Sequence, residues 1–139
     1  MRFAALTFRI AAIVGFLTIV PMYFLYGAIG RADPPALNHP QFYFGFLGVT
    51  LAWQVLFFVL STDPVRYRAM MIPAVLEKAG FLAAVLVLLS LKMMNAQQAI
   101  VTLPDAILLV FFIAAFRKTP RQRDSSRDEQ TIRSAIAAS

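Results

Sequence analysis

The sequence contains no cysteine and a single histidine, His39, among its 139 residues. Without thiolates, disulfide frameworks and cysteine-based metal or redox sites are excluded. One histidine excludes a haem held by two histidines of the same chain, and equally a cluster of histidine ligands. Glycine-rich phosphate loops and the GxSxG turn of serine hydrolases do not occur. We therefore predict neither a metal nor a cofactor.

Charge is also scarce, because only 14% of the residues are charged while 60% are hydrophobic. This is about half the charge of an ordinary soluble domain. A water-soluble core of this size cannot hide so much apolar surface, since small domains bury only about 60–70% of what their unfolded chains expose. The composition excludes soluble globular enzymes and disordered proteins, and it indicates a membrane protein.

Four apolar stretches predict an all-α integral membrane protein, a four-transmembrane-helix bundle. Residues 10–30 and 42–62 carry no charge and are long enough to cross about 30 Å of hydrocarbon. The run 79–91 is too short, so the third span must start near Ala69 and include Glu77 and Lys78. The fourth holds Pro104 and Asp105. We expect spans at about 6–29, 42–61, 69–91 and 99–116, forming one domain over 1–116, and a basic, disordered tail over 117–139.

Two short segments predict how the spans are connected. The sequence Asp63-Pro64 is typical of a helix start, which places the beginning of the third helix there. Pro73 is then expected to kink this helix. The connection 30–41 is rich in proline and is not expected to be helical throughout.

The distribution of lysine and arginine predicts the orientation. With both termini on one side, that side receives eleven cations and the other side receives only Arg31 and Lys92. This bias places both termini in the cytoplasm of a bacterial-type inner (plasma) membrane. The aromatic stretch 22–26 is a poor cleavage region, so we expect the first span to be retained rather than removed as a signal peptide. The basic tail indicates contact with anionic membrane lipids and, lacking interleaved aromatic residues, no nucleic-acid partner.

The polar residues within the predicted membrane spans are the candidate functional residues, because a charge within a span is costly and requires a partner. The helical rise places Gln54 and Glu77 in one layer, each about 12 Å from the inner edge of the hydrocarbon, with Trp53 beside them. Asp105 lies about 9 Å above Glu77 on the same estimate. Neighbouring residues of a helix point about 100° apart, so Glu77 and Lys78 are not expected to share a face. Lys78 then extends either to the inner headgroups or towards Asp105.

Two interpretations of these residues stay open. In the first, an interior site binds a hydrophobic small molecule, neutral or cationic, and is lined by Glu77, Gln54, Trp53, Asp105 and Lys78. In the second, the charged groups pair with polar groups of neighbouring helices and only fix the packing of the bundle.

The layout resembles two groups of small four-span proteins. The length, the four spans and the cytoplasmic termini are similar to those of DoxX-like bacterial membrane proteins. The order of His39-Pro40-Gln41-Phe42, Arg66-Tyr67-Arg68, Pro73 and a basic end resembles that of the EXPERA group of sterol-related isomerases and sigma-2-type receptors. This second resemblance implies an internal lipid-like ligand, and it transfers no catalytic role to any residue here.

Three functions are therefore compared. The first is binding of a lipid or another hydrophobic small molecule, or of a partner helix in a homo-oligomer or another membrane protein. The second is proton-coupled transport, which a membrane carboxylate favours, although the unequal cations oppose the dual-topology type. The third is an isomerase-like enzyme acting on a lipid-soluble substrate, with Glu77 or Asp105 as proton carrier. Their estimated separation restricts such an enzyme to an elongated substrate.

Overall fold

The computed structural model describes residues 2–32, 38–121, 133–134 and 136, and within these ranges the chain forms helices and no strand. Four helical stretches are long and apolar enough to cross a membrane: Arg2–Met22, Pro40–Thr62, Arg68–Ser90 and Ala96–Lys118. The prediction of an all-α chain with four such helices is confirmed. Most of the tail expected to be disordered lies outside the described residues.

The elements are α1 (Arg2–Met22), α2 (Tyr26–Ala32), α3 (Pro40–Thr62), the 3-10 helix η1 (Arg68–Met70), α4 (Met71–Ser90), α5 (Ala96–Ala99), the 3-10 helix η2 (Ile100–Thr102) and α6 (Leu103–Lys118).

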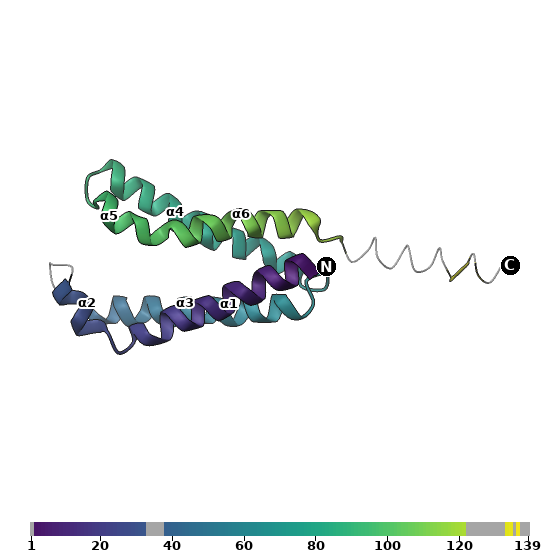
Figure 1. The fold of residues 1–139 in the computed structure, drawn as a ribbon, viewed down its shortest axis with the longest axis horizontal. Coiled ribbons are helices and arrows are strands. Elements are labelled where there is room, and N and C mark those ends of the chain that lie inside the picture. Colours follow the sequence, from purple (N-terminus) through teal and green to yellow (C-terminus); the bar gives the residue numbers. More distant parts are fainter. Residues whose placement is uncertain (1, 33–37, 122–132, 135, 137–139) are drawn as a thin grey trace.

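The long helices form two antiparallel hairpins. Helix α1 packs along α3, and α4 packs along α6, while α1 also contacts α6 and joins the two hairpins. The hairpins meet at the end that holds the N-terminus, and they diverge towards α2 and α5 (Figure 1). We call the first of these the terminal end, since α6 also finishes there, and the second the loop end. Helices α3 and α4 share little contact although they are consecutive.

The hydrophobic core occupies the terminal half of the molecule. It consists of alanine, phenylalanine, leucine and methionine side chains from all four long helices, namely Ala4, Phe8, Ala11, Ala12, Phe57, Leu60, Met71, Ala74, Phe112 and Ala115. In the loop half, only Leu47 and Val85 are buried hydrophobic residues among those described. Large apolar side chains there are exposed instead, including those of Leu17, Phe42 and Leu86. The four helices therefore close on one another at one end only.

The first span is interrupted, contrary to the continuous helix expected over 6–29. Helix α1 begins at Arg2 and ends at Met22, and the chain turns before α2 starts at Tyr26. Pro21 lies in the last turn of α1, where its missing N–H weakens the continuation of the helix. The hydroxyl of Tyr43 in α3 donates a hydrogen bond of 2.8 Å to the carbonyl oxygen of Met22. This hydrogen bond gives a carbonyl group at the end of α1 a partner and connects the end of α1 to α3.

The third long helix also begins later than the Asp63-Pro64 signal predicted. The carboxylate of Asp63 accepts a hydrogen bond from the backbone N–H of Arg66 at 3.1 Å, but this closes only a turn. Helix α4 proper starts at Met71, after η1. Pro73 consequently falls in its first turn, where no intrahelical hydrogen bond is lost. Helix α4 continues unbroken to Ser90, and the kink at Pro73 stays a prediction.

Candidate functional site

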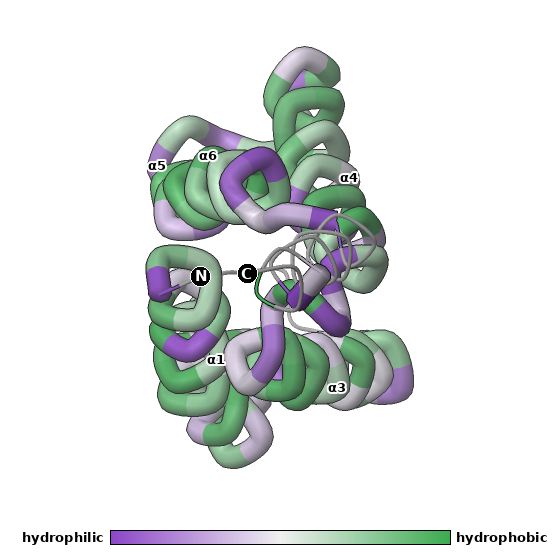
Figure 2. Tube along the Cα trace, turned by 90° about the vertical axis from the view of Figure 1, so that its right-hand side faces the viewer, coloured by the Kyte–Doolittle hydropathy of each residue, from purple (hydrophilic) through white to green (hydrophobic). Residues whose placement is uncertain are grey.

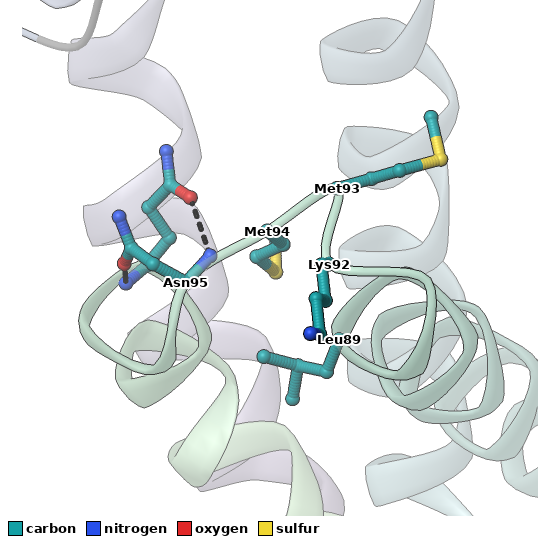
Figure 3. Close-up of a pocket in the computed structure, with 6 residues that line it drawn as sticks. Leu89, Lys92, Met93, Met94 and Asn95 are labelled. Carbon is teal, nitrogen blue, oxygen red and sulfur yellow. Dashed lines mark hydrogen bonds between the residues drawn. The ribbon is translucent and has the colours of Figure 1, made fainter.

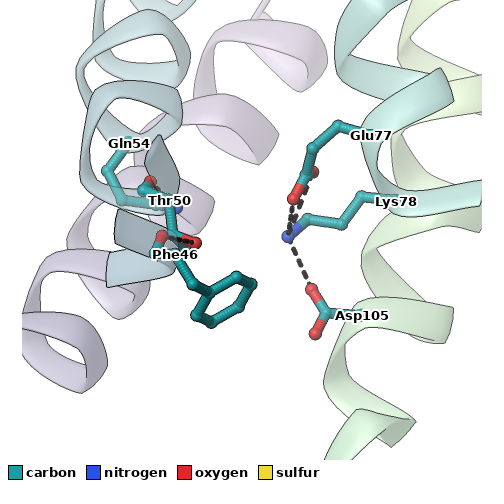
Figure 4. Close-up of polar contacts among 6 residues, drawn as sticks. All are labelled: Phe46, Thr50, Gln54, Glu77, Lys78 and Asp105. Atoms are coloured by element: carbon teal, nitrogen blue, oxygen red, sulfur yellow. Dashed lines mark hydrogen bonds and ion pairs between the residues drawn. The ribbon is translucent and has the colours of Figure 1, made fainter. Parts of the chain in front are cut away.

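An ion triad joins α4 to α6. The ammonium nitrogen of Lys78 lies 2.6 Å from Oδ1 of Asp105 and 3.3 Å from Oε2 of Glu77 (Figure 4). The Lys78 side chain is 8% exposed. Glu77 and Lys78 are adjacent on α4 and were not expected to share a face, but the four-carbon stem of Lys78 brings its ammonium group back to the carboxylate of its neighbour. Of the two directions considered for Lys78, the one towards Asp105 is observed.

Two local features place the triad. Asp105 lies in the first turn of α6, directly after Pro104, which occupies one of the first two positions of this helix. A carboxylate near a helix N-terminus is favoured by the helix dipole. Lys78 lies one turn beyond Ala74, the last α4 residue of the core cluster. The triad therefore stands at the edge of the core that faces the loop end.

Aromatic rings close the terminal side of the triad. The Lys78 ammonium group lies 5.7 Å from the centroid of the Phe57 ring. Phe57 packs against Phe112 at 5.0 Å between centroids, and Phe112 packs against Phe8 at 4.5 Å. All three phenylalanines are at most 1% exposed. We call Phe8, Phe57 and Phe112 the aromatic trio. It separates the triad from the terminal end of the molecule.

The charges of the triad do not balance. Two carboxylates face one ammonium group, so one negative charge is in excess when both acids are ionised. Oε2 of Glu77 is buried and accepts no hydrogen bond from the described residues, although it lies in ion-pair range of Lys78. Buried polar atoms nearly always have a hydrogen-bond partner. Glu77 is therefore the member of the triad suited to hold a proton or to accept a hydrogen bond from a bound molecule.

Gln54 lies apart from the triad, although depth alone placed it in the same layer as Glu77. Its side chain is buried between α3 and α1, where Nε2 donates to the carbonyl oxygen of Thr50 at 3.0 Å. It lies directly over Gly15, since a Cβ atom built there would stand 1.9 Å from Oε1 of Gln54. Trp53 is half-buried against the core, with its ring 6.2 Å from that of Phe57. The structure thus brings together Glu77, Lys78 and Asp105, and it assigns Gln54 to the α1–α3 contact.

The close contact of Gly15 with Gln54 gives a testable coupling. Gly15→Ala should destabilise the protein, because the buried Gln54 side chain must move, even though alanine is about 1 kcal/mol better than glycine within a helix. Gln54→Ala removes the obstacle, so the same Gly15→Ala change should be neutral or stabilising in that background. Thermal unfolding of the two single variants and the double variant in detergent measures this. Additive effects of the two substitutions would contradict the contact.

Sequence reasoning missed the role of Arg68. Its Nε donates to the carbonyl oxygen of Thr119 at 2.7 Å, and Nη2 donates to that of Phe116 at 3.2 Å. The guanidinium group also lies 4.0 Å from the centroid of the Phe116 ring. Arg68 thus satisfies carbonyl groups at the end of α6, which have no partner within the helix. Nothing in the linear pattern distinguishes this arginine from Arg66.

A pocket of about 430 Å³ lies at the connection between α4 and α5, and no residue of the triad lines it (Figure 3). It is lined by residues around this turn: Leu89, Lys92, Met93, Met94, Asn95 and Gln98. The side chains of Asn95 and Gln98 each bond the backbone N–H of the other at 2.8 and 3.0 Å, forming a capping box for α5. Two polar side chains of the pocket therefore support the local helix start.

The fold and site define a protein of four long apolar helices with a partly buried ion triad between two of them. No protein-family model, curated protein or solved structure matches the chain. The resemblance to the DoxX-like and EXPERA groups consequently stays a prediction from the layout of the sequence.

Proposed function

We propose that this protein is an integral protein of a bacterial-type inner membrane, with both termini in the cytoplasm. We propose further that it binds a hydrophobic small molecule or lipid between its two hairpins. In this proposal the ligand occupies the loop half, and a polar group of the ligand contacts Glu77. The single observation that carries the proposal is the buried Oε2 of Glu77, which accepts no hydrogen bond from the described residues within an otherwise paired triad.

The exposed surface beyond the triad supports an apolar ligand. Towards the loop end the side chains of Phe46 and Val49 on α3 are exposed, as are those of Val101 in η2 and Leu103 at the start of α6. The aromatic trio blocks the opposite direction. A ligand with an apolar body and one hydrogen-bond donor fits both surfaces, because its body contacts these side chains while its donor meets Glu77. Apolar surroundings with a few placed polar groups are typical of small-molecule sites.

Native mass spectrometry of the protein purified in a mild detergent tests this function. The wild-type protein should carry a bound small molecule or lipid. Glu77→Gln should lower the occupied fraction at least about tenfold, since losing a hydrogen bond to a charged group costs about 1.5–3 kcal/mol. Asp63→Asn is the matched control, because it removes a carboxylate outside the triad and should leave occupancy unchanged.

Three outcomes would count against the proposal. The first is an empty wild-type protein in mild detergent, and the second is equal occupancy in the Glu77→Gln and Asp63→Asn variants. The third is a second polypeptide in place of a small molecule, which would favour the partner-helix function. Trp53→Ala gives an independent check, since it enlarges the space beside Phe57 without changing the charge, and it should also release the ligand.

Proton-coupled transport is a second candidate, which one observation favours. The helices close on the aromatic trio at one end and diverge at the other, which is the arrangement expected of a transporter open to one side (Figure 1). A carboxylate in excess at the edge of the core, on the side that faces the diverging end, is suited to carry the coupled proton. Glu77→Gln should then abolish proton-coupled uptake into vesicles, and retained uptake would exclude Glu77 as the carrier.

A further inference from the structure

We propose that the terminal end carries a binding surface for the headgroups of anionic phospholipids. We call this surface the basic collar, and it consists of Arg2, Arg9, Arg66, Arg117, Lys118 and Arg121. This inference rests on the membrane location proposed above but not on the ligand at Glu77. It concerns a separate surface at the opposite end of the core.

The basic collar gathers unpaired charge from three parts of the chain. Its residues come from α1, from the α3–α4 connection and from the end of α6, and all six are exposed. None of them forms an ion pair with another described residue, and within the described ranges the ion pairs are those of Lys78 with Glu77 and Asp105. Viewed from this end, hydrophilic segments lie at the ends of α1 and α6 and in the connection between α3 and α4 (Figure 2).

The acid at this end does not neutralise the basic collar. Asp63 is the acidic residue among the described residues of the terminal end, and its Oδ1 accepts the backbone N–H of Arg66. Arg68 is excluded from the surface because its guanidinium group donates to the carbonyl groups of Phe116 and Thr119. The basic collar therefore presents its positive charge to whatever lies beyond the helix ends.

Aromatic rings hold two of these cations at the boundary between apolar and charged surface. The ammonium group of Lys118 lies 4.8 Å from the centroid of the Phe3 ring, and the guanidinium group of Arg66 lies 5.5 Å from that of Tyr67. Such contacts restrict long side chains without neutralising them. A cation restrained in this way loses less conformational entropy when it binds a phosphate group.

The surface next to the basic collar selects an amphiphilic partner. Leu6 and Ile10 on α1, Ile72 on α4 and Phe111 on α6 are exposed apolar residues within the terminal half. A phospholipid satisfies both surfaces at once, because its phosphate meets the collar while its acyl chains cover these side chains. A nucleic acid or a free phosphate ion fits only the charged part. At the loop end the described cations are Arg31 and Lys92, so the preference should belong to the terminal end.

Lipid binding by the full chain in detergent, followed by native mass spectrometry, tests the inference. Phosphatidylglycerol should bind at least about tenfold more tightly than phosphatidylcholine of the same chain length, because each cation near a lipid surface contributes about 1 kcal/mol, or about fivefold. Arg66→Gln/Lys118→Gln should remove most of this preference. Arg31→Gln/Lys92→Gln is the matched control, because it removes the same two residue types from the loop end, and it should keep the preference. Raising the salt concentration from about 0.1 M to 1 M should weaken the preference, since the screening length falls from about 10 to 3 Å.

Equal binding of the two lipids, or equal losses in the two double variants, would overturn the inference. Competition by a short oligonucleotide or by inorganic phosphate as strong as that by phosphatidylglycerol would also overturn it, since acyl chains would then contribute nothing. Arg117→Gln/Arg121→Gln provides a second test if Arg66→Gln/Lys118→Gln does not fold. The Glu77→Gln variant should retain the phosphatidylglycerol preference, so failure of the ligand site and failure of the basic collar are distinguishable.

Discussion

Replacing Lys78 by methionine is expected to lower the free energy of unfolding by about 3–5 kcal/mol, the largest effect of any single charge removal in the described chain. The substitution keeps the length of the side chain but leaves the carboxylates of Glu77 and Asp105 together without a counter-charge. The side chains of Glu77 and Asp105 are 18% and 26% exposed, so water replaces only part of the lost attraction. Unfolding by a denaturing detergent, followed by circular dichroism, measures the change.

Removal of the whole triad provides the control for this prediction. The triple variant Glu77→Gln/Lys78→Met/Asp105→Leu carries no charge at the site, and a buried ion pair replaced by apolar groups is often neutral or stabilising. We therefore expect the triple variant to recover most of the stability lost in Lys78→Met. A Lys78→Met variant within about 1 kcal/mol of the wild type would show that the ammonium group does not hold the triad together.

Phe112→Ala is expected to cost about 3–5 kcal/mol, comparable to the loss at Lys78, for a different physical reason. Phe112 is fully buried and contacts both other members of the aromatic trio. Truncation leaves a cavity at the point where the two hairpins meet, and the facing rings can fill it only in part. The same unfolding measurement tests this prediction.

The neighbouring residue Phe111 supplies the control. Its side chain is 44% exposed and makes only a distant ring contact of 6.2 Å with Phe3. Phe111→Ala should therefore cost no more than about 1 kcal/mol. Similar losses at the two positions would mean that helix propensity, rather than packing in the aromatic trio, determines the stability of α6.

The number and nature of the long helices were predictable because apolar length alone determines them. Their ends were not, because contacts between distant residues decide where a helix stops. The break after Met22 is accompanied by a hydrogen bond from Tyr43, which lies on another helix. The late start of α4 depends on η1, whose Arg68 is bound to the end of α6. Pattern reasoning treats each segment separately and cannot detect such pairs.

The candidate site was predictable to a similar degree. Glu77, Lys78 and Asp105 were identified because charged residues within an apolar run need partners, and the structure pairs them. The grouping with Gln54 rested on depth, which gives the level of a residue along a helix but not the direction in which its side chain points. Gln54 faces α1 because Gly15 leaves room for it there. This rotational information appears only when the facing helix is known.

The two ties between α4 and α6 have a mechanical consequence. Arg68 fixes the terminal end of this hairpin, while the Lys78–Asp105 pair fixes it further along. Helices α4 and α6 therefore form one rigid unit. The fit of Gln54 over Gly15 makes α1 and α3 a second rigid unit. When the spacing of these two helix pairs changes, one pair must rotate relative to the other about Phe8, Phe57 and Phe112. A small adjustment of these three rings then displaces the helices by an amount that grows with distance from the rings. This displacement is largest at α2 and α5.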